Sequence, residues 1–327
     1  MSIPIDKFIN RMVRVGSDGV RLCLDAREAG GVDNTRMGED AMKIGLMHLT
    51  PYSKADPAVV AKRAEDLGFE SYWVGDHTII PETSSVQYPG VREGGAAPDF
   101  LWQLPDPLLA LARAGATTSR IKLGTGVCLI PERNPILTAK QVATLDDSSG
   151  GRVLFGIGGG WNPEESAILG GDFEHRWSQV KDYIAAMKVL WTEDISEYHG
   201  RYVNFPPVRC FPKPKSKPYP PILLGSINNP RALRRVAEWG DGWLPVVQSV
   251  DEFTDGVQRI KAIAVEIGRD PHTLDFTVFG GMKQWRSAQE IQNFEHAGAN
   301  RVVLWLIGQD LDSILAEMEE LARTVLL

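Results

Sequence analysis

The sequence predicts an α/β protein that folds as a (β/α)₈ TIM barrel with insertion loops at the C-terminal face of the strands. Short apolar runs, suited to buried parallel strands, alternate with segments of helical period, and the alternation occurs eight times over residues 42–327. Eight such units favour a closed parallel barrel over an open doubly wound sheet. Two long connections, 79–106 and 193–221, are interpreted as lids or binding loops on one rim.

Each predicted strand is a short β-branched or apolar run, and a helical period follows it before the next strand begins. The strands are expected at 43–49, 71–75, 121–127, 152–157, 222–224, 242–247, 274–279 and 301–307. The helices are expected at 56–67, 107–116, 136–145, 164–169 with 177–191, 230–239, 251–267, 288–297 and 310–326. Residues 1–41 are polar and have no sustained apolar period after Leu24, so we expect an N-terminal extension, partly disordered or acting as an oligomer arm.

Composition narrows the class of protein. The chain has 327 residues and a net charge of −7, which argues against nucleic acid as the main partner because phosphate binding needs clustered Lys and Arg. No apolar run reaches the roughly 18 residues of a membrane helix, so no membrane partner is expected. The three cysteines form no Cys-x-x-Cys pair, which favours a reduced, cytoplasmic protein. No His-x-His or His-Glu-x-x-His occurs, so no metal site is expected.

Polar side chains follow the first two predicted strands. His48 ends the first strand, and Asp76 and His77 follow the second, so all three are candidates for the barrel mouth. For His48 a hydrogen-bonded histidine near the core is an equal alternative. For the other two, the alternative is a turn cap at Asp76 beside a surface histidine, and their position at a strand end favours a functional role.

Glycine-rich turns close the next three strands. Their candidate binding residues are Thr125, Gly126 and Val127 after the third strand, Gly158, Gly159 and Gly160 after the fourth, and Gly225 and Ser226 after the fifth. Glycines there allow a flat group to approach the backbone, or form a bulge that lets the barrel curve. The fourth and fifth turns lead into helices, whose N-termini suit an anion, although simple helix capping explains the fifth as well. Such a mouth suits a large, flat, anionic cofactor that supplies its own chemistry.

Six stretches carry a resemblance to a known family. They are residues 67–77, 121–135, 145–165, 172–176, 190–194 and 220–245. They include Gly75-Asp76-His77 and Gly124-Thr125-Gly126-Val127, and they are distributed over nearly all of residues 42–270. In these stretches the sequence resembles the luciferase-like monooxygenase superfamily, especially its coenzyme F420-dependent branch.

The resemblance implies roles for the candidate residues. Asp76 would contact the deazaflavin ring, and His77 would lie beside its reacting C5 edge as a proton donor or polariser. The peptide Gly126–Val127 would be cis and brace the ring from behind. Gly159 and Gly160 would lie along the ring's other edge. The cofactor phosphate would bind at Gly225 and Ser226.

The sequence departs from the sugar-phosphate dehydrogenases of this branch at two positions. Trp161 stands where they have an active-site glutamate, and Pro81 stands where they have a tryptophan. A sugar phosphate is therefore not expected. Trp161 and Trp102 favour an apolar or aromatic small-molecule substrate instead, and we take His77, His48 and Trp161 as the candidate catalytic residues.

Three functions follow from this interpretation. We favour hydride transfer between the deazaflavin C5 of coenzyme F420 and a small organic substrate, since a flavin-like ring with carbon at that position moves hydride. The first alternative is an FMN-dependent monooxygenase that uses reduced flavin and O₂. The second is a non-catalytic structural barrel subunit. The resemblance also implies a homodimer.

Overall fold

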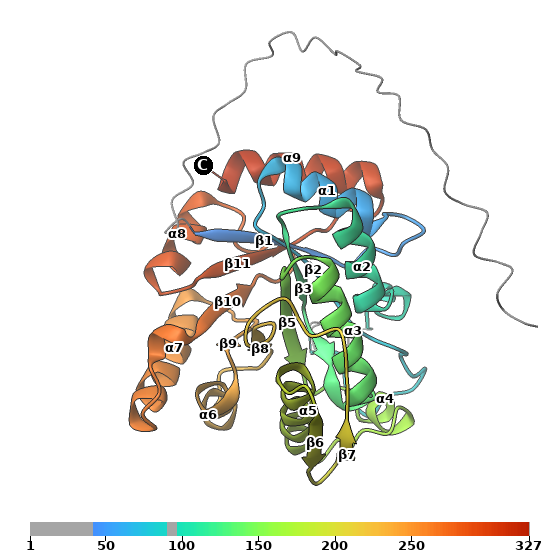
Figure 1. Ribbon diagram of the computed structural model, residues 1–327. Helices are drawn as coiled ribbons and strands as arrows, with labels where there is room; N and C mark the ends of the chain where they lie inside the picture. The colour runs from blue at the N-terminus through green and yellow to red at the C-terminus, as the bar shows by residue number, and fades with distance from the viewer. Residues whose placement is uncertain (1–41, 90–96, 327) are drawn as a thin grey trace, which may run out of the picture. The chain divides into compact units, whose positions relative to one another are not determined.

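The structure, a computed structural model, describes residues 42–89 and 97–326. Eight parallel strands form a closed barrel with helices around it (Figure 1). The strands are β1 (Lys43–His48), β2 (Ser71–Val74), β3 (Lys122–Thr125) with its continuation β4 (Cys128–Leu129), β5 (Val153–Gly158), β8 (Ile222–Leu224), β9 (Gly242–Trp243), β10 (Asp275–Phe279) and β11 (Arg301–Trp305). Pairing of β1 with β11 and of β3 with β5 closes the circle, so the predicted TIM barrel is confirmed.

The helices lie outside the strands. They are α1 (Pro57–Leu67), α2 (Pro107–Thr117), α3 (Pro135–Ser148), α4 (Pro163–Ile168), α5 (Arg176–Thr192), α6 (Pro230–Trp239), α7 (Val250–Glu266), α8 (Ala288–His296) and α9 (Leu311–Val325), with short 3₁₀ turns η2 (Asp99–Gln103), η3 (Ile130–Glu132) and η4 (Pro271–Thr273). Five of them begin with proline after a residue whose side chain accepts a backbone N–H: Asp56, Asp106, Asn134, Asn162 and Asn229. This cap followed by proline fixes where each helix starts, at the C-terminal face of the barrel.

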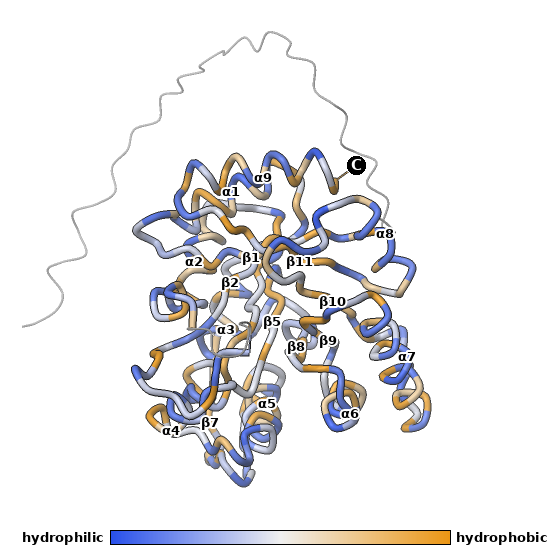
Figure 2. Tube along the Cα trace, turned by 180° about the vertical axis from the view of Figure 1, so that it is seen from behind, coloured by the Kyte–Doolittle hydropathy of each residue, from blue (hydrophilic) through white to orange (hydrophobic). Residues whose placement is uncertain are grey.

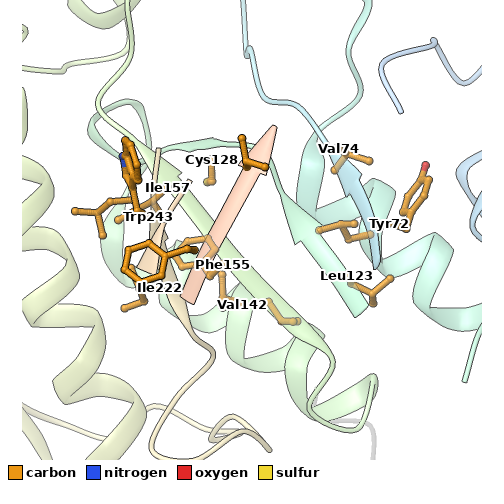
Figure 3. Close-up of a cluster of buried hydrophobic side chains, with 14 of the residues drawn as sticks. Tyr72, Val74, Leu123, Cys128, Val142, Phe155, Ile157, Ile222 and Trp243 are labelled. Carbon is orange, nitrogen blue, oxygen red and sulfur yellow. The ribbon is translucent and has the colours of Figure 1, made fainter. Parts of the chain in front are cut away.

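Two apolar layers hold the barrel together. The larger one lies between the strands and the helices, and Figure 3 shows part of it, with side chains from β2, β3, β4, β5, β8, β9 and α3. The helices alternate between hydrophilic and hydrophobic residues along their length, as burial of one side requires (Figure 2). The smaller layer fills the barrel interior, where Trp73 meets Phe279 edge to face at 5.4 Å.

One of the two long connections has a different place from the one predicted. Residues 193–221 connect a helix to a strand and contain an antiparallel hairpin, β6 (Ser196–His199) with β7 (Asn204–Val208). The hairpin packs on α5, where Asp182 accepts hydrogen bonds from the Tyr198 hydroxyl (2.8 Å) and the Tyr202 amide (2.6 Å). It is therefore part of the outer layer, and the interpretation as a lid on the rim is wrong.

Other boundaries differ by a few residues. The sixth strand was expected over 242–247, and regular pairing ends at Trp243, with one further bridge at Val246. The expectation for residues 1–41 lies outside the described residues and stays a prediction. In the described part of the chain, no helix is long and apolar enough to cross a membrane.

Candidate active site

His77 lies at the C-terminal end of β2, where both of its ring nitrogens have partners. Nδ1 lies 2.8 Å from Glu165 Oε2, and Nε2 accepts the indole N–H of Trp161 at 3.1 Å. Because an indole nitrogen only donates, Nε2 carries no proton in this arrangement, and Nδ1–H donates to the carboxylate. The two contacts therefore select one tautomer and fix the plane of the imidazole ring.

Trp161 joins His77 to a small cavity on the rim. Its ring meets His77 edge on, at 5.7 Å between centroids, and Tyr88 at 5.4 Å on another side. Trp161, Tyr88, Ile80 and Pro81 line a cavity of about 180 Å³ together with other described residues of the connection between β2 and α2. The structure thus brings two of the three candidate catalytic residues together.

A second cavity, of about 340 Å³, opens on the same face above β1 and β11. Its apolar lining is Leu49, Phe100, Met282, Trp305 and Ile307, and its polar lining includes Lys54, Asp99 and Gln103. Trp102, expected to face a substrate, is 51% exposed and is not among these residues.

The bulge after β3 is built as the resemblance implied, because the peptide Gly126–Val127 is cis. Val127 lies over the ends of the next two strands. A Cβ at Gly158 would lie 2.7 Å from Val127 Cγ2, and one at Gly225 would lie 2.7 Å from Val127 Cγ1. These two glycines therefore make room for Val127, and the three residues form one surface at the mouth.

The turn after β5 brings two further groups to the mouth. A Cβ at Gly159 would lie 3.3 Å from both Arg176 Cγ and Trp177 Cε2, at the start of α5. Gly160 has φ +77°, which favours glycine, and a Cβ there would lie 2.8 Å from Glu132 Oε1. The glycines thus allow an arginine and a buried glutamate to approach the turn.

Ser226 and a group of arginines lie at the end of β8. Ser226 accepts the indole N–H of Trp243 through its carbonyl (3.1 Å) and its hydroxyl oxygen (3.2 Å), which leaves the hydroxyl hydrogen to donate. The Gly225 amide donates to the Ile157 carbonyl at 2.8 Å and is used in the fold. Arg235 stacks on Trp177 at 4.8 Å.

Arg176, Arg231 and Arg235 form a cationic group between the N-termini of α5 and α6. Burial lowers the pKa of Arg235, and the charges of Arg176 and Arg231 lower it further. The Arg176 Nε is buried and has no partner among the described residues. These neighbouring guanidinium groups lie beside two helix N-termini and form no ion pair with a carboxylate among the described residues. Such a group of cations can bind an anion.

His48 and Asp76 are hydrogen-bonded to other residues and not to His77 or Trp161. Side chains alternate along a strand, so Met47 points into the barrel while His48 points outward, where its Nδ1 lies 2.6 Å from the Tyr72 hydroxyl. Burial lowers the pKa of His48 to about 4. The geometry matches the alternative of a near-core histidine.

Asp76 also points outward. Its carboxylate accepts two hydrogen bonds from Arg133 (2.7 and 3.0 Å) and one from the Leu129 amide (3.0 Å). Arg133 also binds Asp106, the N-cap of α2, at 3.0 Å. The carboxylate therefore holds β2, β4 and α2 together, and the contact of Asp76 with the cofactor stays a prediction. The Thr125 hydroxyl likewise is used within the fold, donating to the Gly156 carbonyl at 2.6 Å.

Four residues of the site were not predicted from the sequence: Glu132, Glu165, Arg133 and Arg176. Glu165 could have been suspected, because Asn162-Pro163 marks a helix start after the glycine turn and places it in the first turn. The others had no local signal. In the described part of the chain, no group of three or more His, Cys, Asp or Glu could hold a metal ion.

A flat cofactor with an anionic end fits these residues. Val127, which fills the space beside Gly158 and Gly225, offers an apolar surface, and His77 offers a positioned imidazole. Arg176, whose Nη1 donates to the Phe173 carbonyl, offers a buried Nε without a partner among the described residues. This donor set suits an aromatic ring and a phosphate, and it contains no group typical of covalent catalysis.

Comparison with known proteins decides the family. The family model described as luciferase-like monooxygenase matches residues 42–292. This chain belongs to that family. An uncharacterised protein of Mycobacterium tuberculosis is 35% identical over 70% of this chain and 80% of the relative. The phthiodiolone/phenolphthiodiolone dimycocerosates ketoreductase of the same species is 26% identical over 77% of this chain and 68% of the relative.

Solved structures of luciferase-like proteins share the fold. Monooxygenase RslO1 from Streptomyces bottropensis has a TM-score of 0.70 at 19% identity, covering 87% of this chain and 99% of the other. The coenzyme F420-dependent tetrahydromethanopterin reductase of Methanopyrus kandleri scores 0.67 at 20% identity, covering 87% and 98%. An F420-dependent secondary alcohol dehydrogenase scores 0.66 at 18% identity, covering 85% and 97%. Two of these structures are named as F420-dependent, and a further neighbour, a type II Baeyer-Villiger monooxygenase of Pseudomonas putida (TM-score 0.59, 20% identity), is in complex with FMN.

Proposed function

We propose that this protein is a coenzyme F420-dependent oxidoreductase that transfers a hydride between the deazaflavin C5 and a small organic substrate. The observation that carries the proposal is that His77, fixed by Glu165 and Trp161, lies at the same end of the barrel as the surface formed by Val127, Gly158 and Gly225. A protein that holds a hydride carrier needs such a surface and one well-placed proton-transfer group, and it needs no nucleophile of its own.

Different residues of this chain would bind the cofactor ring, bind its anionic end and transfer the proton. Val127, Gly158 and Gly225 would hold the ring, and Arg176 with Ser226 would hold its anionic end. The deazaflavin supplies a hydride donor or acceptor at C5 when bound. Nε2 of His77 can take a proton from a substrate hydroxyl, or return one to a carbonyl oxygen, when the indole of Trp161 turns aside.

A ketone or a secondary alcohol is the substrate class to assay first. The relative at 26% identity is named as a ketoreductase, and one structural neighbour is a secondary alcohol dehydrogenase. Both reactions interconvert a carbonyl and a hydroxyl group. The larger cavity, with Leu49, Phe100 and Trp305 on its walls, suits an apolar body attached to that group.

The second candidate is an FMN-dependent monooxygenase that uses reduced flavin and O₂. It is favoured by the likeness to monooxygenase RslO1 and to an oxygenase solved in complex with FMN. FMN also has a flat ring and a phosphate, so the same surface and Arg176 would serve it.

Equilibrium binding of oxidised coenzyme F420 and of FMN, followed by tryptophan fluorescence, tests the proposal. Trp161 lies at the mouth and Trp243 contacts Ser226, so a bound ring should quench emission. We expect tight binding of F420, weak binding of FMN, and weaker F420 binding in Gly158→Val, whose side chain would displace Val127. His272→Ala, at an exposed histidine on η4, is the control and should bind normally.

The other outcomes separate the alternatives. A preference for FMN would assign the protein to the monooxygenases. Binding of neither cofactor would favour the non-catalytic barrel. A homodimer, a separate proposal, is tested by light scattering after size-exclusion chromatography, where a mass of one chain would contradict it.

A further inference from the structure

Two buried carboxyl groups, Glu132 and Glu165, lie at η3 and the start of α4, and Glu165 also binds His77. Glu165, on the first turn of α4, is fully buried and uses only Oε2 to bind His77. Glu132, at the end of η3, is 6% exposed. η3 packs against α4, and Glu132 Oε1 approaches the position of a Cβ at Gly160, directly before Trp161.

Unpartnered polar atoms gather between these two elements. Within the described residues, five buried side-chain atoms of η3 and the start of α4 lack a hydrogen-bond partner. They are both oxygens of Glu132, Oε1 of Glu165, Nδ2 of Asn162 and Oγ of Ser166. Asn162 Nδ2 and Ser166 Oγ can donate, but neither is hydrogen-bonded to a carboxyl group. Buried polar groups are normally hydrogen-bonded, so two ionised carboxylates, which only accept, would leave three buried oxygens without a donor.

The charges around Glu132 favour its neutral form. Burial, together with the carboxylates of Glu165 and Asp76, raises the pKa of Glu132 to about 9 against the opposing effect of Arg133. The other element packed on η3 is α5, which offers the neutral Gln179 to the Pro131 carbonyl. A protonated carboxyl is a donor, and Glu165 Oε1 is the acceptor that lacks one.

We propose that Glu132 and Glu165 share one proton beside His77, with Glu132 donating its O–H to Glu165 and Glu165 acting as the positioning residue that fixes the His77 tautomer. The pair gives a partner to Glu165 Oε1 and to one oxygen of Glu132, and it gives Glu165 two donors, one from each side. It also makes the orientation of His77 depend on a residue that does not touch it.

The pair has a consequence for proton transfer, and this consequence rests on the proposed function. When His77 Nε2 takes the proton of a substrate hydroxyl, the Nδ1 proton can move to Glu165, so that the ring stays neutral and the pair holds two protons. In the direction of carbonyl reduction the same protons return by the same atoms. Glu165 and Glu132 thus would store the proton that accompanies the hydride.

Infrared spectroscopy of the full chain without cofactor tests the shared proton. We expect a protonated carboxyl band at pH 7 that shifts in D₂O, disappears in Glu132→Gln, and is lost on titration toward pH 9 and above. Glu295→Gln, at an exposed glutamate of α8, is the matched control and should retain the band. Absence of the band from the wild-type protein, or its persistence in Glu132→Gln, would overturn the proposal.

Long-range ¹⁵N NMR of the imidazole rings tests the positioning role. The chain has six histidines, and His77→Ala assigns the relevant signals. Trp161 also selects this tautomer, so the test is made in Trp161→Phe, which removes the indole donor. In that background we expect the Nδ1–H pattern with Glu165 present, its loss in Glu165→Leu, and its retention in Glu132→Gln, whose amide still donates to Glu165. An unchanged His77 pattern in the folded Trp161→Phe/Glu165→Leu variant would refute the role of Glu165.

These measurements are independent of the cofactor. If the protein shows the infrared band and the tautomer but binds no F420, the shared proton is supported and the proposed function is contradicted. If the protein binds F420 but shows no band, the proposed function is supported and the shared proton of Glu132 and Glu165 is contradicted.

Discussion

The ion pair between Arg133 and Asp76 offers a test of what Asp76 does. Its side chains are 12% and 2% exposed, and two hydrogen bonds of 2.7 and 3.0 Å join them. Arg133→Ala would leave the buried Asp76 carboxylate with only the Leu129 amide. Removing one partner of a buried pair costs about 3–5 kcal/mol, so we expect the free energy of unfolding to fall by that amount.

The matched control is Arg113→Ala, which removes an arginine that also pairs with an aspartate. Arg113 is 54% exposed and its partner Asp56 is 30% exposed. Exposed pairs contribute about 0.2–1 kcal/mol, so the control should lose far less. Urea unfolding at pH 7, followed by far-UV circular dichroism, gives both values.

Equal losses in the two variants would refute the reasoning that Asp76 is structural. A second result bears on the same point. Asp76→Asn should lower stability while the folded fraction still binds cofactor, because the carboxylate is directed at Arg133. Loss of cofactor binding at unchanged stability would instead support the contact between Asp76 and the cofactor ring that the family resemblance implied.

Three further predictions concern pH and charge. The wild-type protein should lose about 3 kcal/mol of stability between pH 6.5 and 4, because His48 takes up a proton there in the unfolded chain but, with a pKa of about 4, not in the folded protein. His48→Gln should abolish this loss, as measured by urea unfolding. The wild-type free energy of unfolding should fall between about pH 5 and pH 9 by up to about 1.4 kcal/mol per pH unit, because in that range Glu132 ionises only in the unfolded chain, and Glu132→Gln should remove this fall. A wild-type curve without this slope would contradict the raised pKa of Glu132. Arg176→Ala should weaken cofactor binding by about ten- to a hundredfold, the contribution of one hydrogen bond to a charged group, while the exposed Arg234→Ala leaves it unchanged.

Much of the fold followed from local signals in the chain. Eight alternations of strand and helix predicted the closed barrel, and the cis peptide at Gly126–Val127 was expected from the family resemblance. The hairpin at 196–208 was missed because its segment is rich in proline and lacks a clear alternation. Its place is set by contacts with α5, which no local pattern reports.

The candidate site was predicted less completely. Strands buried on both faces are apolar at nearly every position, so the sequence does not say which side chains point into the barrel. His48, Asp76 and His77 therefore looked alike, and only the closed sheet showed that His48 binds Tyr72, Asp76 binds Arg133 and His77 binds Trp161.

What the sequence by itself determined was the barrel, its glycine turns and the family. Only the tertiary structure decided which groups meet. Glu132 and Glu165 are 33 positions apart, and Arg176 and Arg235 are 59 apart, so their proximity depends on how η3, α4, α5 and α6 pack around the strands. Local periodicity encodes the elements because it repeats within each one, whereas the chemistry of this site arises between elements, where burial and neighbouring charges act across the closed barrel.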